Sequence, residues 1–429
     1  MTKGKTRVML DNGLVIITKK VDVHGAYTSL GINVGSIDEP AAKNGLAHLV
    51  EHMFFRTNRN MTGDQYQEAL EWAGIDYNAM TSFTDTIFYA DSQKNQVCDV
   101  INLFYDAISN NDFIEEGFET EKSAVISELR DFHRSSLDRF HERIMWPVIY
   151  KGTPLEKAII GTVESVKNLS LEDVQKFTNT FYVPNNMVMA CTGDIDTEVF
   201  IEGVKNTFGQ LKSREFDKLK IDWKFKPGKK YVEFKDLKDE HCRELDLSFF
   251  YVIYPMSNLK KQDFATATVL ETVLGGGNLT NFTGKIIGEL RVKRGLCYST
   301  DVEFEWDQGI PLAVIGVPGI HPQNLDEGIN IVLNTLHELG SQELKNDYFK
   351  GKISQTKRRL KPNYYYIDNL VEEIIRREFS KNRLITDTSI KEIGNVSPKR
   401  LKYFAQKIFS QEPLIVAASA PGYKNQFNS

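Results

Sequence analysis

Two copies of one pattern run through the chain, and this duplication constrains the fold more than any other feature of the sequence. Ser170 opens the run SLEDVQKF, and 227 positions later Ser397 opens the run SPKRLKYF. Each serine is a typical N-cap residue at the start of an amphipathic helix. At the same offset the apolar residues 187–190 match residues 414–417, which predicts a buried strand at the end of each half. The sequence therefore predicts two copies of one mixed α/β unit.

A second match lies nearer the start of each copy. Residues 71–74 and Tyr77 correspond to residues 292–295 and Tyr298 at an offset of 221 positions. The drift between the two offsets requires only a short loop insertion. The pattern that relates the two halves therefore extends well beyond their last strands.

The length of the chain agrees with this division. A chain of 429 residues is too long for one ordinary core and suggests two domains of about 200 residues each. The run 215–230 is rich in lysine and contains a proline, as expected for a linker. We therefore expect a first repeat over residues 1–214, a linker over 215–232 and a second repeat over 233–429.

Local patterns predict the elements of the first repeat. Asn12-Gly13 stands between two apolar runs, which is a strong signal for a β-hairpin. A serine N-cap at Ser170 predicts the helix before the last strand. The remaining predictions are strands over 27–34 and within 77–90, and helices over 62–72, 94–110 and 116–132.

A helical pattern over residues 45–55 carries the chemistry of the first repeat. His48 and His52 are four positions apart, so they lie one turn apart on the same face of a helix, and Glu51 falls beside them. Two imidazoles can bind one metal ion while a carboxylate faces its bound water. The order H-x-x-E-H is the inverse of the commoner zinc motif and keeps the same division of roles. The alternative is a helix whose histidines merely cap a core.

The second repeat has no such motif. Its corresponding helical run, residues 264–274, contains no histidine. Gly275, Gly276 and Gly277 follow, but their spacing fits neither a dinucleotide-binding loop nor a phosphate-binding loop. We interpret them as a flexible turn and expect the metal chemistry in the first repeat alone.

A third metal ligand is expected from elsewhere in the chain, because a catalytic zinc typically has three protein ligands and one open position. On a helix over residues 116–132, one stripe contains Glu121, Val125, Glu128 and Phe132. Carboxylates that share a stripe with apolar side chains are partly buried and need a cation or a donor. Periodicity leaves open which of the two glutamates binds metal and whether the other is an ordinary surface residue.

Bulk properties exclude several classes of function. The net charge of −5 and a pI near 6.0 give no electrostatic case for binding nucleic acid or an anionic membrane. No segment approaches the length of apolar sequence that a membrane span needs. The basic residues 3–7 pass directly into a strand pattern, so we expect no signal peptide. The scattered cysteines are expected to be reduced core residues of a cytoplasmic protein. They are Cys98, Cys191, Cys242 and Cys297.

In these residues the sequence resembles the pitrilysin family of zinc peptidases, which includes insulysin and the mitochondrial processing peptidase. The strongest part of the resemblance is GLAHLVEHM, residues 45–53. In the family a distal glutamate completes the zinc site, and Glu128 stands at the matching position, 76 residues after His52. Glu121 matches a supporting glutamate. The resemblance implies one Zn²⁺ per chain, held by His48, His52 and Glu128, with Glu51 as the general base.

Two further segments resemble family landmarks. The run LRVKRGLCYS resembles the segment whose arginine and tyrosine bind substrate and stabilise the reacting carbonyl, which implies these roles for Arg291 and Tyr298. From the residues alone, Arg291 would be a solvated helix residue and Tyr298 a core aromatic residue. The second segment resembles the edge strand onto which an extended peptide substrate adds. It comprises Asn78, Ala79, Met80 and Thr81, although Thr84 stands where relatives often have glutamate.

The resemblance also implies the fold and the assembly. It implies an α+β fold of two homologous α/β sandwich repeats, each a mixed, largely antiparallel sheet with helices packed on it, which together form half of a clamshell. Long members of the family carry four such repeats, so we expect a homodimer in which the C-terminal repeat of the partner completes each active site. The expected activity is an endopeptidase acting on peptides or unfolded segments in an enclosed chamber. The alternatives are a processing peptidase for one precursor and a catalytically silent scaffold or partner subunit.

Overall fold

The protein is described by a computed structural model, and the statements below concern the residues whose placement it defines. These are residues 5–54, 56, 63–109, 113, 115–132, 136–219, 221–233, 247–257, 259–276, 281–305, 311–360, 367–379 and 390–419. The chain divides into two compact units. Unit 1 comprises residues 1–131, 157–221 and 362–381, and unit 2 comprises residues 132–156, 222–361 and 382–429.

Unit 1 is built on a mixed sheet in which β2 and β6 are parallel and the other neighbouring strands are antiparallel. The Asn12-Gly13 turn joins β1 to β2, as the hairpin signal predicts, and Gly13 has a φ of +87°. In their order across the sheet, the strands are β1 (Lys5–Met9), β2 (Val15–Lys20), β6 (Met187–Gly193), β3 (Ala26–Ile32), β5 (Thr86–Ser92) and β4 (Asp76–Thr81).

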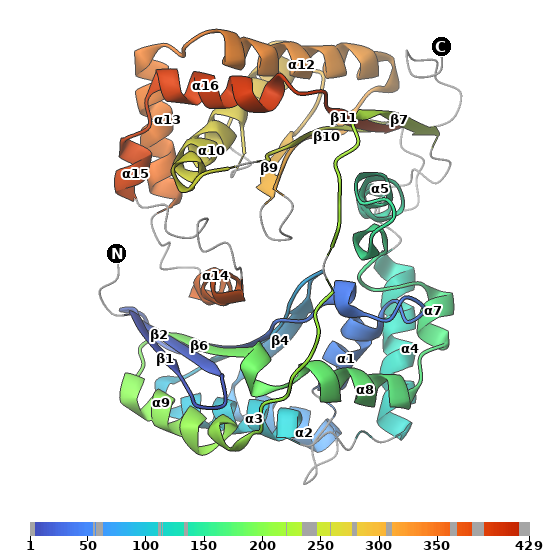
Figure 1. Ribbon diagram of the computed structural model, residues 1–429, viewed down its shortest axis with the longest axis vertical. Helices are drawn as coiled ribbons and strands as arrows, with labels where there is room; N and C mark the ends of the chain where they lie inside the picture. The colour runs from blue at the N-terminus through green and yellow to red at the C-terminus, as the bar shows by residue number, and fades with distance from the viewer. Residues whose placement is uncertain are drawn as a thin grey trace. The chain divides into compact units, whose positions relative to one another are not determined.

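Helices cover one face of this sheet (Figure 1), and a large apolar core lies between them and the strands. Strand residues such as Met187, Met189 and Cys191 point into it, and the helices contribute their apolar stripes. The helices of unit 1 outside the exchanged segment are α1 (Leu46–Phe54), α2 (Gly63–Ala73), α3 (Val97–Ser109), α4 (Glu115–Phe132), α7 (Val163–Lys167), α8 (Leu171–Phe181) and α9 (Thr197–Asn206).

The opposite face of the same sheet is covered by α14 (Ile367–Phe379), which comes from the C-terminal half of the sequence (Figure 1). Val188 and Ala190 of β6 point toward this side, so β6 is buried on both faces. Val371 and Ile375 of α14 are fully buried against the strands. Burial of an aliphatic side chain of this size contributes about 1.5–3 kcal/mol, so α14 is an integral part of unit 1.

Unit 2 has a second sheet with the same plan. β7 and β11 are parallel, and the remaining neighbours are antiparallel, as at the corresponding places in unit 1. Ser170 and Ser397 both cap the helix that precedes the final strand, which confirms this part of the predicted duplication. In order, the strands are β7 (Gly228–Glu233), β11 (Leu414–Ser419), β8 (Ser248–Pro255), β10 (Leu312–Ile320) and β9 (Asp301–Glu305).

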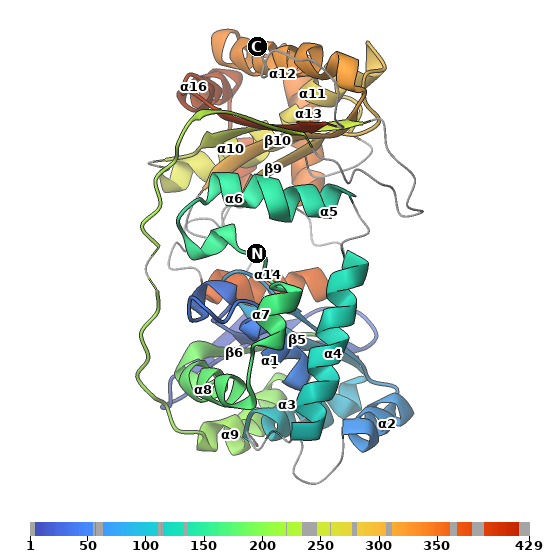
Figure 2. The same ribbon diagram turned by 90° about the vertical axis from the view of Figure 1, so that its right-hand side faces the viewer.

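Helices lie on both faces of the second sheet (Figure 2). Helices α12 and α16 lie on one face, and α5 and α6 on the other, where Phe140 packs at ring-centroid distances of 5.5 Å from Phe249 and 5.7 Å from Tyr251. The helices of unit 2 are α5 (Ser136–Phe140), a π-helical turn (His141–Met145), α6 (Trp146–Ile149), α10 (Lys261–Leu274), α11 (Lys285–Ile287), a second π-helical turn (Gly288–Val292), α12 (Leu325–Ser341), α13 (Asn346–Arg359), α15 (Ile390–Gly394) and α16 (Pro398–Phe409).

The two units exchange segments. Residues 132–156 follow α4 of the first half but belong to unit 2, and residues 362–381 follow α13 of the second half but belong to unit 1. Each sheet therefore has one face covered by a helical segment from the other half of the sequence. The two units are discontinuous in sequence even though the five described strands of unit 2 follow the same order as β2, β6, β3, β5 and β4 of unit 1.

Several predicted details can be compared with these elements. Gly74 and Gly295, matched in the repeat, both have left-handed backbones, with φ values of +67° and +65°. Thr62, Asn110 and Cys242 lie outside the described residues. The prediction that the cysteines are core residues holds for Cys191 and Cys297 but is wrong for Cys98, which lies on the exposed face of the amphipathic helix α3.

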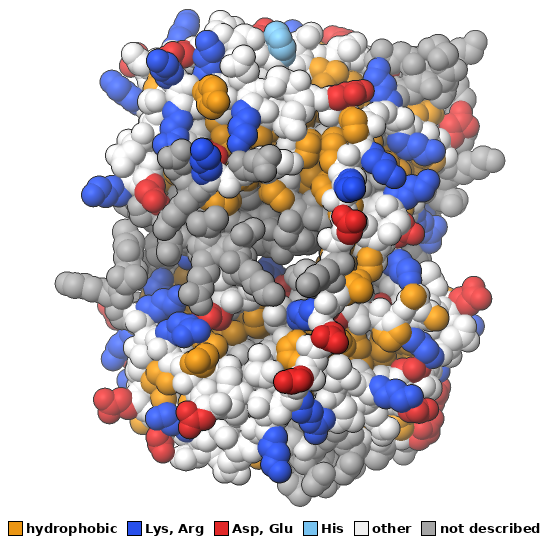
Figure 3. Space-filling view, viewed as in Figure 1, with side chains coloured by type: hydrophobic (Ala, Val, Ile, Leu, Met, Phe, Trp, Pro, Cys, Tyr) orange, Lys and Arg blue, Asp and Glu red, His pale blue; other side chains and the backbone are white. Residues whose placement is uncertain are grey.

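Side chains of both charge signs are mixed on the face of the molecule shown in Figure 3. Lys and Arg side chains lie among Asp and Glu side chains on the face shown in Figure 3, in keeping with the small net charge of −5. None of the helices in the described part of the chain combines the length and the apolar character that crossing a membrane requires.

Candidate metal centre

Helix α1 forms because its apolar positions fall on one side. Leu46, Leu49, Val50 and Met53 are buried in the core of unit 1, as their helical spacing predicts. The same spacing turns His48 and His52 toward another face, where their ring centroids are 4.7 Å apart.

The amino end of α1 is capped by a buried carboxylate that precedes it in the sequence. Glu39 accepts hydrogen bonds from the backbone N–H groups of Gly45 (3.1 Å) and Ala47 (2.8 Å) and from the side chain of Asn44. These N–H groups have no partner within the helix, and the helix dipole also favours an anion at this end. Burial raises the pKa of the Glu39 carboxyl to about 8, although the three donors act against this rise. Glu39 therefore fixes the start of the helix that carries both histidines.

The structure brings His48, His52 and Glu128 together. One ligand atom from each lies within 4.8 Å of the others, which is a separation that one ion could bridge. Glu128 comes from α4, and its carboxylate oxygens are 3.2 Å from Nε2 of His52 and 3.7 Å from Nε2 of His48. The prediction from periodicity left Glu121 and Glu128 open, and the geometry places Glu128 beside both imidazoles.

Glu121 lies on the same stripe of α4 as Glu128, two turns earlier, and contacts the other ring nitrogen of His52. Its carboxylate accepts a hydrogen bond of 3.2 Å from Nδ1 of His52 and one of 2.7 Å from Nε of Arg56. This arrangement fixes the orientation of the His52 ring and leaves Nε2 facing Glu128. Sequence reasoning missed Arg56, which follows α1 and also contacts Asp64 at 2.8 Å.

The two histidines have opposite electrostatic environments. Burial and the neighbouring His52 lower the pKa of His48 to about 4, although Glu128 opposes this change. Burial also disfavours charged His52, but the hydrogen bonds that His52 donates to Glu121 and Glu128 outweigh it and raise the pKa of His52 to about 9. The carboxyl of Glu128 has a lowered pKa, chiefly because it accepts a hydrogen bond from His52. In addition, Nδ1 of His48 is buried without a hydrogen-bond partner.

Glu51 lies beside this cluster and contacts β4. The Thr81 hydroxyl donates a hydrogen bond to the Glu51 carboxylate, which links the helix to the edge of the sheet. Burial raises the pKa of Glu51, although Thr81 and His52 lower it. A partly buried carboxylate with a raised pKa, next to a set of metal-binding side chains, has the properties of a general base.

The predicted substrate strand is an edge strand. Asn78, Ala79, Met80 and Thr81 all lie in β4, which pairs only with β5 among the described strands. Beyond it, the Ser82 hydroxyl accepts hydrogen bonds from the backbone N–H groups of Thr84 and Asp85, which shapes the turn to β5. None of the described strands pairs with the outer edge of β4, which is the position that an added strand would take.

Arg291 and Tyr298 lie in unit 2 and contact each other. Nη1 of Arg291 donates a hydrogen bond of 2.8 Å to the Tyr298 carbonyl, and its guanidinium lies 4.4 Å from the centroid of the Tyr298 ring. A second ring, that of Phe282, is 4.7 Å from the same guanidinium. Tyr298 is 79% exposed, so the expectation of a core aromatic residue, drawn from the residues alone, is wrong. The pair instead presents a cation and a phenol hydroxyl at the surface of unit 2.

Comparison with known protein families accounts for both halves of the chain. Residues 14–163 match the family described as Insulinase (Peptidase family M16), and residues 168–356 match the Peptidase M16 inactive domain. The chain belongs to peptidase family M16. The second half matches a domain described as inactive, in agreement with the lack of histidine in residues 264–274. The resemblance drawn from the H-x-x-E-H motif is confirmed at the level of the family.

Relatives of this M16 chain include named proteases. It is 24% identical to an uncharacterized zinc protease of Streptomyces coelicolor over 416 residues. The aligned region covers 95% of this chain and 88% of that protein. It is 29% identical over 297 residues to the probable mitochondrial-processing peptidase subunit beta of Arabidopsis thaliana, covering 67% of this chain and 54% of that protein. The chain therefore matches about half the length of the plant protein. The family and these relatives support a peptidase.

Solved structures share the fold. A protease from Helicobacter pylori superposes with a TM-score of 0.81 at 19% identity, over 97% of this chain and 99% of that one. The periplasmic protease PqqL from Escherichia coli superposes with a TM-score of 0.77 at 17% identity, over 97% of this chain but only 47% of that one. These similarities and the two mixed sheets confirm the predicted fold class. This M16 chain corresponds in fold to about half of the longer protein.

The donor set of the M16 site fits zinc. Two imidazole nitrogens and one carboxylate oxygen are three ligands of two types that zinc prefers, and three protein ligands leave a position open. Without a cation, His48 and His52 lie among the carboxylates of Glu51, Glu121 and Glu128. Nδ1 of His48 is buried without a hydrogen-bond partner. The residues present therefore match the metal that the relatives' names imply.

Zinc binding should release a proton at neutral pH. His52, with its pKa raised to about 9, is protonated in the metal-free protein at pH 7, and a metal ligand must be neutral. The zinc affinity should therefore fall about tenfold for each pH unit below 9. Titration calorimetry at pH 7 in buffers of different ionisation enthalpy should detect about one proton released per zinc bound. Binding without proton release would contradict the contact of protonated His52 with Glu121 and Glu128.

Proposed function

We propose that this chain is a zinc metalloendopeptidase that hydrolyses peptides or unfolded protein segments. The observation that carries the proposal is the convergence of His48, His52 and Glu128 within 4.8 Å, with Glu51 beside them and hydrogen-bonded to an edge strand. Membership of a family whose relatives include zinc proteases supports it. We assign zinc binding to the repeat over 1–214 and the substrate-binding pair Arg291 and Tyr298 to the repeat over 233–429.

Three residues would hold the metal. His48 and His52 would bind through ring nitrogens, Glu128 through its carboxylate, and one Zn²⁺ per chain is required. A zinc ion bound there would act as a Lewis acid and would lower the pKa of a bound water molecule toward about 7. Glu121 keeps the His52 ring oriented through Nδ1, and Arg56 keeps the Glu121 carboxylate charged and in place.

Glu51 supplies the proton transfers. Its carboxylate accepts the proton of the attacking water and then donates that proton to the nitrogen of the leaving amine. The raised pKa of Glu51 suits the role of base, because a carboxylate that is a stronger base accepts the proton of water more readily. The hydrogen bond from Thr81 holds this carboxylate next to the end of β4.

The substrate would bind as an added strand along β4. Residues 78–81 expose one edge of the sheet, and Thr81 at the end of this strand contacts the general base directly. Backbone hydrogen bonds would supply affinity with little demand on side-chain sequence. The scissile peptide bond would then lie close to Glu51 for a chain that pairs with β4.

Arg291 and Tyr298 would act on the reacting carbonyl. Both present hydrogen-bond donors, as an oxyanion that develops during hydrolysis requires. We propose a homodimer in which this pair from the C-terminal repeat of one subunit completes the zinc site of its partner, within a chamber enclosed by the two subunits. The match of this chain to about half of a longer protease supports an assembly of two chains.

Two other functions remain as alternatives. A processing peptidase for one precursor is supported by similarity to a protein named as a mitochondrial-processing peptidase subunit. A catalytically silent partner subunit is opposed by the presence of His48, His52, Glu128 and Glu51 in one cluster. Digestion of a mixed peptide library, with products identified by mass spectrometry, separates general cleavage from cleavage at one defined sequence. We expect activity in a cytoplasmic setting.

Replacement of the general base should separate catalysis from metal binding. Glu51→Gln should retain zinc, because Glu51 is not one of the three ligands, but should lower kcat by about 10²–10⁴-fold. His52→Ala should lose both zinc and activity. Zinc content by elemental analysis and hydrolysis of a quenched fluorescent peptide measure the two properties. Hydrolysis by the Gln variant at the parent rate would contradict the assignment of the base.

Mixed dimers test the shared active site. Arg291→Ala and Glu51→Gln should each inactivate a homodimer, because each removes one component of both sites. In a mixed dimer, one of the two sites has intact Glu51 and an intact Arg291 from the partner. Equal amounts of the two variants, after subunit exchange, should therefore recover about a quarter of the parent activity. Absence of recovery in confirmed mixed dimers would exclude sharing of Arg291.

A further inference from the structure

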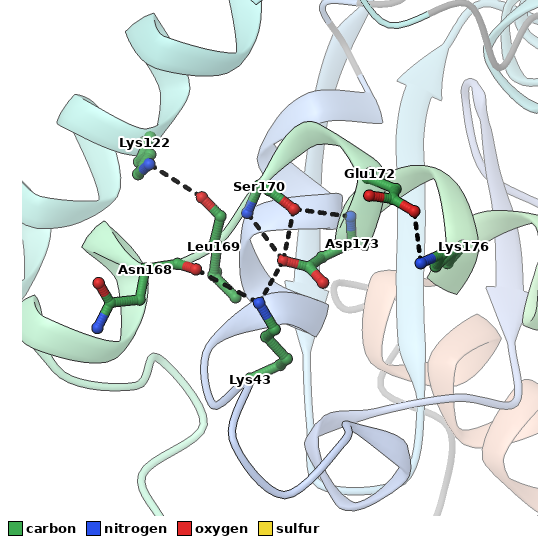
Figure 4. Close-up of polar contacts among 8 residues, drawn as sticks. All are labelled: Lys43, Lys122, Asn168, Leu169, Ser170, Glu172, Asp173 and Lys176. Carbon is green, nitrogen blue, oxygen red and sulfur yellow. Dashed lines mark hydrogen bonds and ion pairs between the residues drawn. The ribbon is translucent and has the colours of Figure 1, made fainter.

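A short segment between α7 and α8 contacts both helices that carry metal ligands (Figure 4). Lys43, just before α1, donates hydrogen bonds from Nζ to Oδ2 of Asp173 at 2.7 Å and to the Asn168 carbonyl at 3.4 Å. The backbone carbonyl of Lys43 accepts a hydrogen bond from the N–H of Leu46, the first residue of α1. The segment is therefore tied to the start of the helix that bears His48 and His52.

The same segment is tied to α4. Nζ of Lys122 donates a hydrogen bond of 3.0 Å to the Leu169 carbonyl and lies 5.0 Å from the centroid of the Phe118 ring (Figure 4). The Lys122 side chain is only 12% exposed, so this contact is partly shielded from water. Lys122 is the neighbour of Glu121 and lies six residues, about 9 Å along the helix, from Glu128. It therefore fixes the part of α4 that supports the metal cluster.

The segment between these two contacts is itself held firmly. Ser170 donates hydrogen bonds from its hydroxyl (2.7 Å) and its backbone N–H (2.9 Å) to Oδ2 of Asp173, and the Ser170 hydroxyl accepts one from the Asp173 N–H (Figure 4). This capping box satisfies orphan donors at the start of α8. Leu169 is buried in the core of unit 1. The acceptors for Lys43 and Lys122 are therefore fixed in space.

We propose that Lys43 and Lys122 are positioning residues that set the metal site by joining α1 and α4 through the segment 168–173. His48 and His52 share one helix, so their separation follows from helical geometry alone. The distance to Glu128 depends on how α4 is placed against α1, and metal sites tolerate displacements of only about 0.2–0.5 Å. Two ammonium groups that converge on one capped segment supply this restraint. The inference rests on the proposed zinc site.

A neighbouring ion pair provides a matched control. Glu172 and Lys176 lie on α8 and form a pair in the same close-up, but their side chains are 71% and 70% exposed (Figure 4). This contact lies within α8 and reaches neither α1 nor α4. An exposed pair of this kind contributes little to stability. Lys176→Met therefore controls for the loss of a lysine charge near the site.

The test compares zinc affinity in the full-length variants Lys43→Met, Lys122→Met and Lys176→Met. Competition with a chromophoric chelator should give zinc dissociation constants at least about tenfold larger for Lys43→Met and Lys122→Met than for the parent. Loss of other residues that support metal ligands has effects of this size. Lys176→Met should remain within about twofold of the parent. Lys122→Arg, which retains a donor toward the Leu169 carbonyl, should restore most of the affinity.

Thermal unfolding of the metal-free variants separates positioning from general stability. If the two lysines had a purely structural role, Lys43→Met and Lys122→Met would lower the unfolding temperature but leave the zinc affinity of the folded protein unchanged. This result would overturn the proposal. Asp173→Asn removes the charge from the carboxylate that Lys43 and Ser170 share, so it should weaken zinc binding even if Lys43→Met does not fold. Parent-like zinc affinity in this variant would also overturn the proposal. Failure of the parent protein to bind zinc would instead refute the proposed function.

Discussion

The contact on which the rest of the site depends is that of His52 with two carboxylates from α4. Glu121 contacts Nδ1 and Glu128 contacts Nε2, so one imidazole links the two helices. Glu121 is buried, and burying a charged group is costly unless it is paired and hydrogen-bonded; here His52 and Arg56 both donate to its carboxylate. A cation between Nε2 and Glu128 would replace the proton that holds this pair together in the metal-free protein. The same geometry thus serves folding and metal binding.

The remaining contacts of unit 1 keep these helices in place. Glu39 caps the amino end of α1, Arg56 holds Glu121 at the other end, and Thr81 joins Glu51 to β4. The exchanged helix α14 covers the far side of the sheet, and its Arg376 contacts Asp85 at 3.4 Å in the turn beyond β4. The edge strand and the general base therefore rest on a sheet that is packed on both faces. Catalytic geometry of this kind needs rigid support, because small displacements are costly.

Much of this structure could be predicted from local sequence. Hydrophobic spacing predicts α1 and the side of it that is buried, and serine caps reveal the duplication, because both signals depend on residues close together in the chain. Other features depend on residues far apart. Periodicity could not choose between Glu121 and Glu128, since both lie on one stripe, and the exchange of residues 132–156 and 362–381 leaves no local pattern. Glu39 could have been found as an acidic residue shortly before a helix start, whereas Arg56 carries no such signal.

The most direct test of the account is the location of zinc in crystals of the parent protein purified without chelator. Anomalous diffraction measured above and below the zinc absorption edge identifies the ion and its position independently of any assay. The account predicts one peak per chain, about 2.0–2.2 Å from a ring nitrogen of His48, a ring nitrogen of His52 and a carboxylate oxygen of Glu128. A zinc-supplemented crystal with no anomalous peak among these three side chains, or with the peak at other residues, would contradict it.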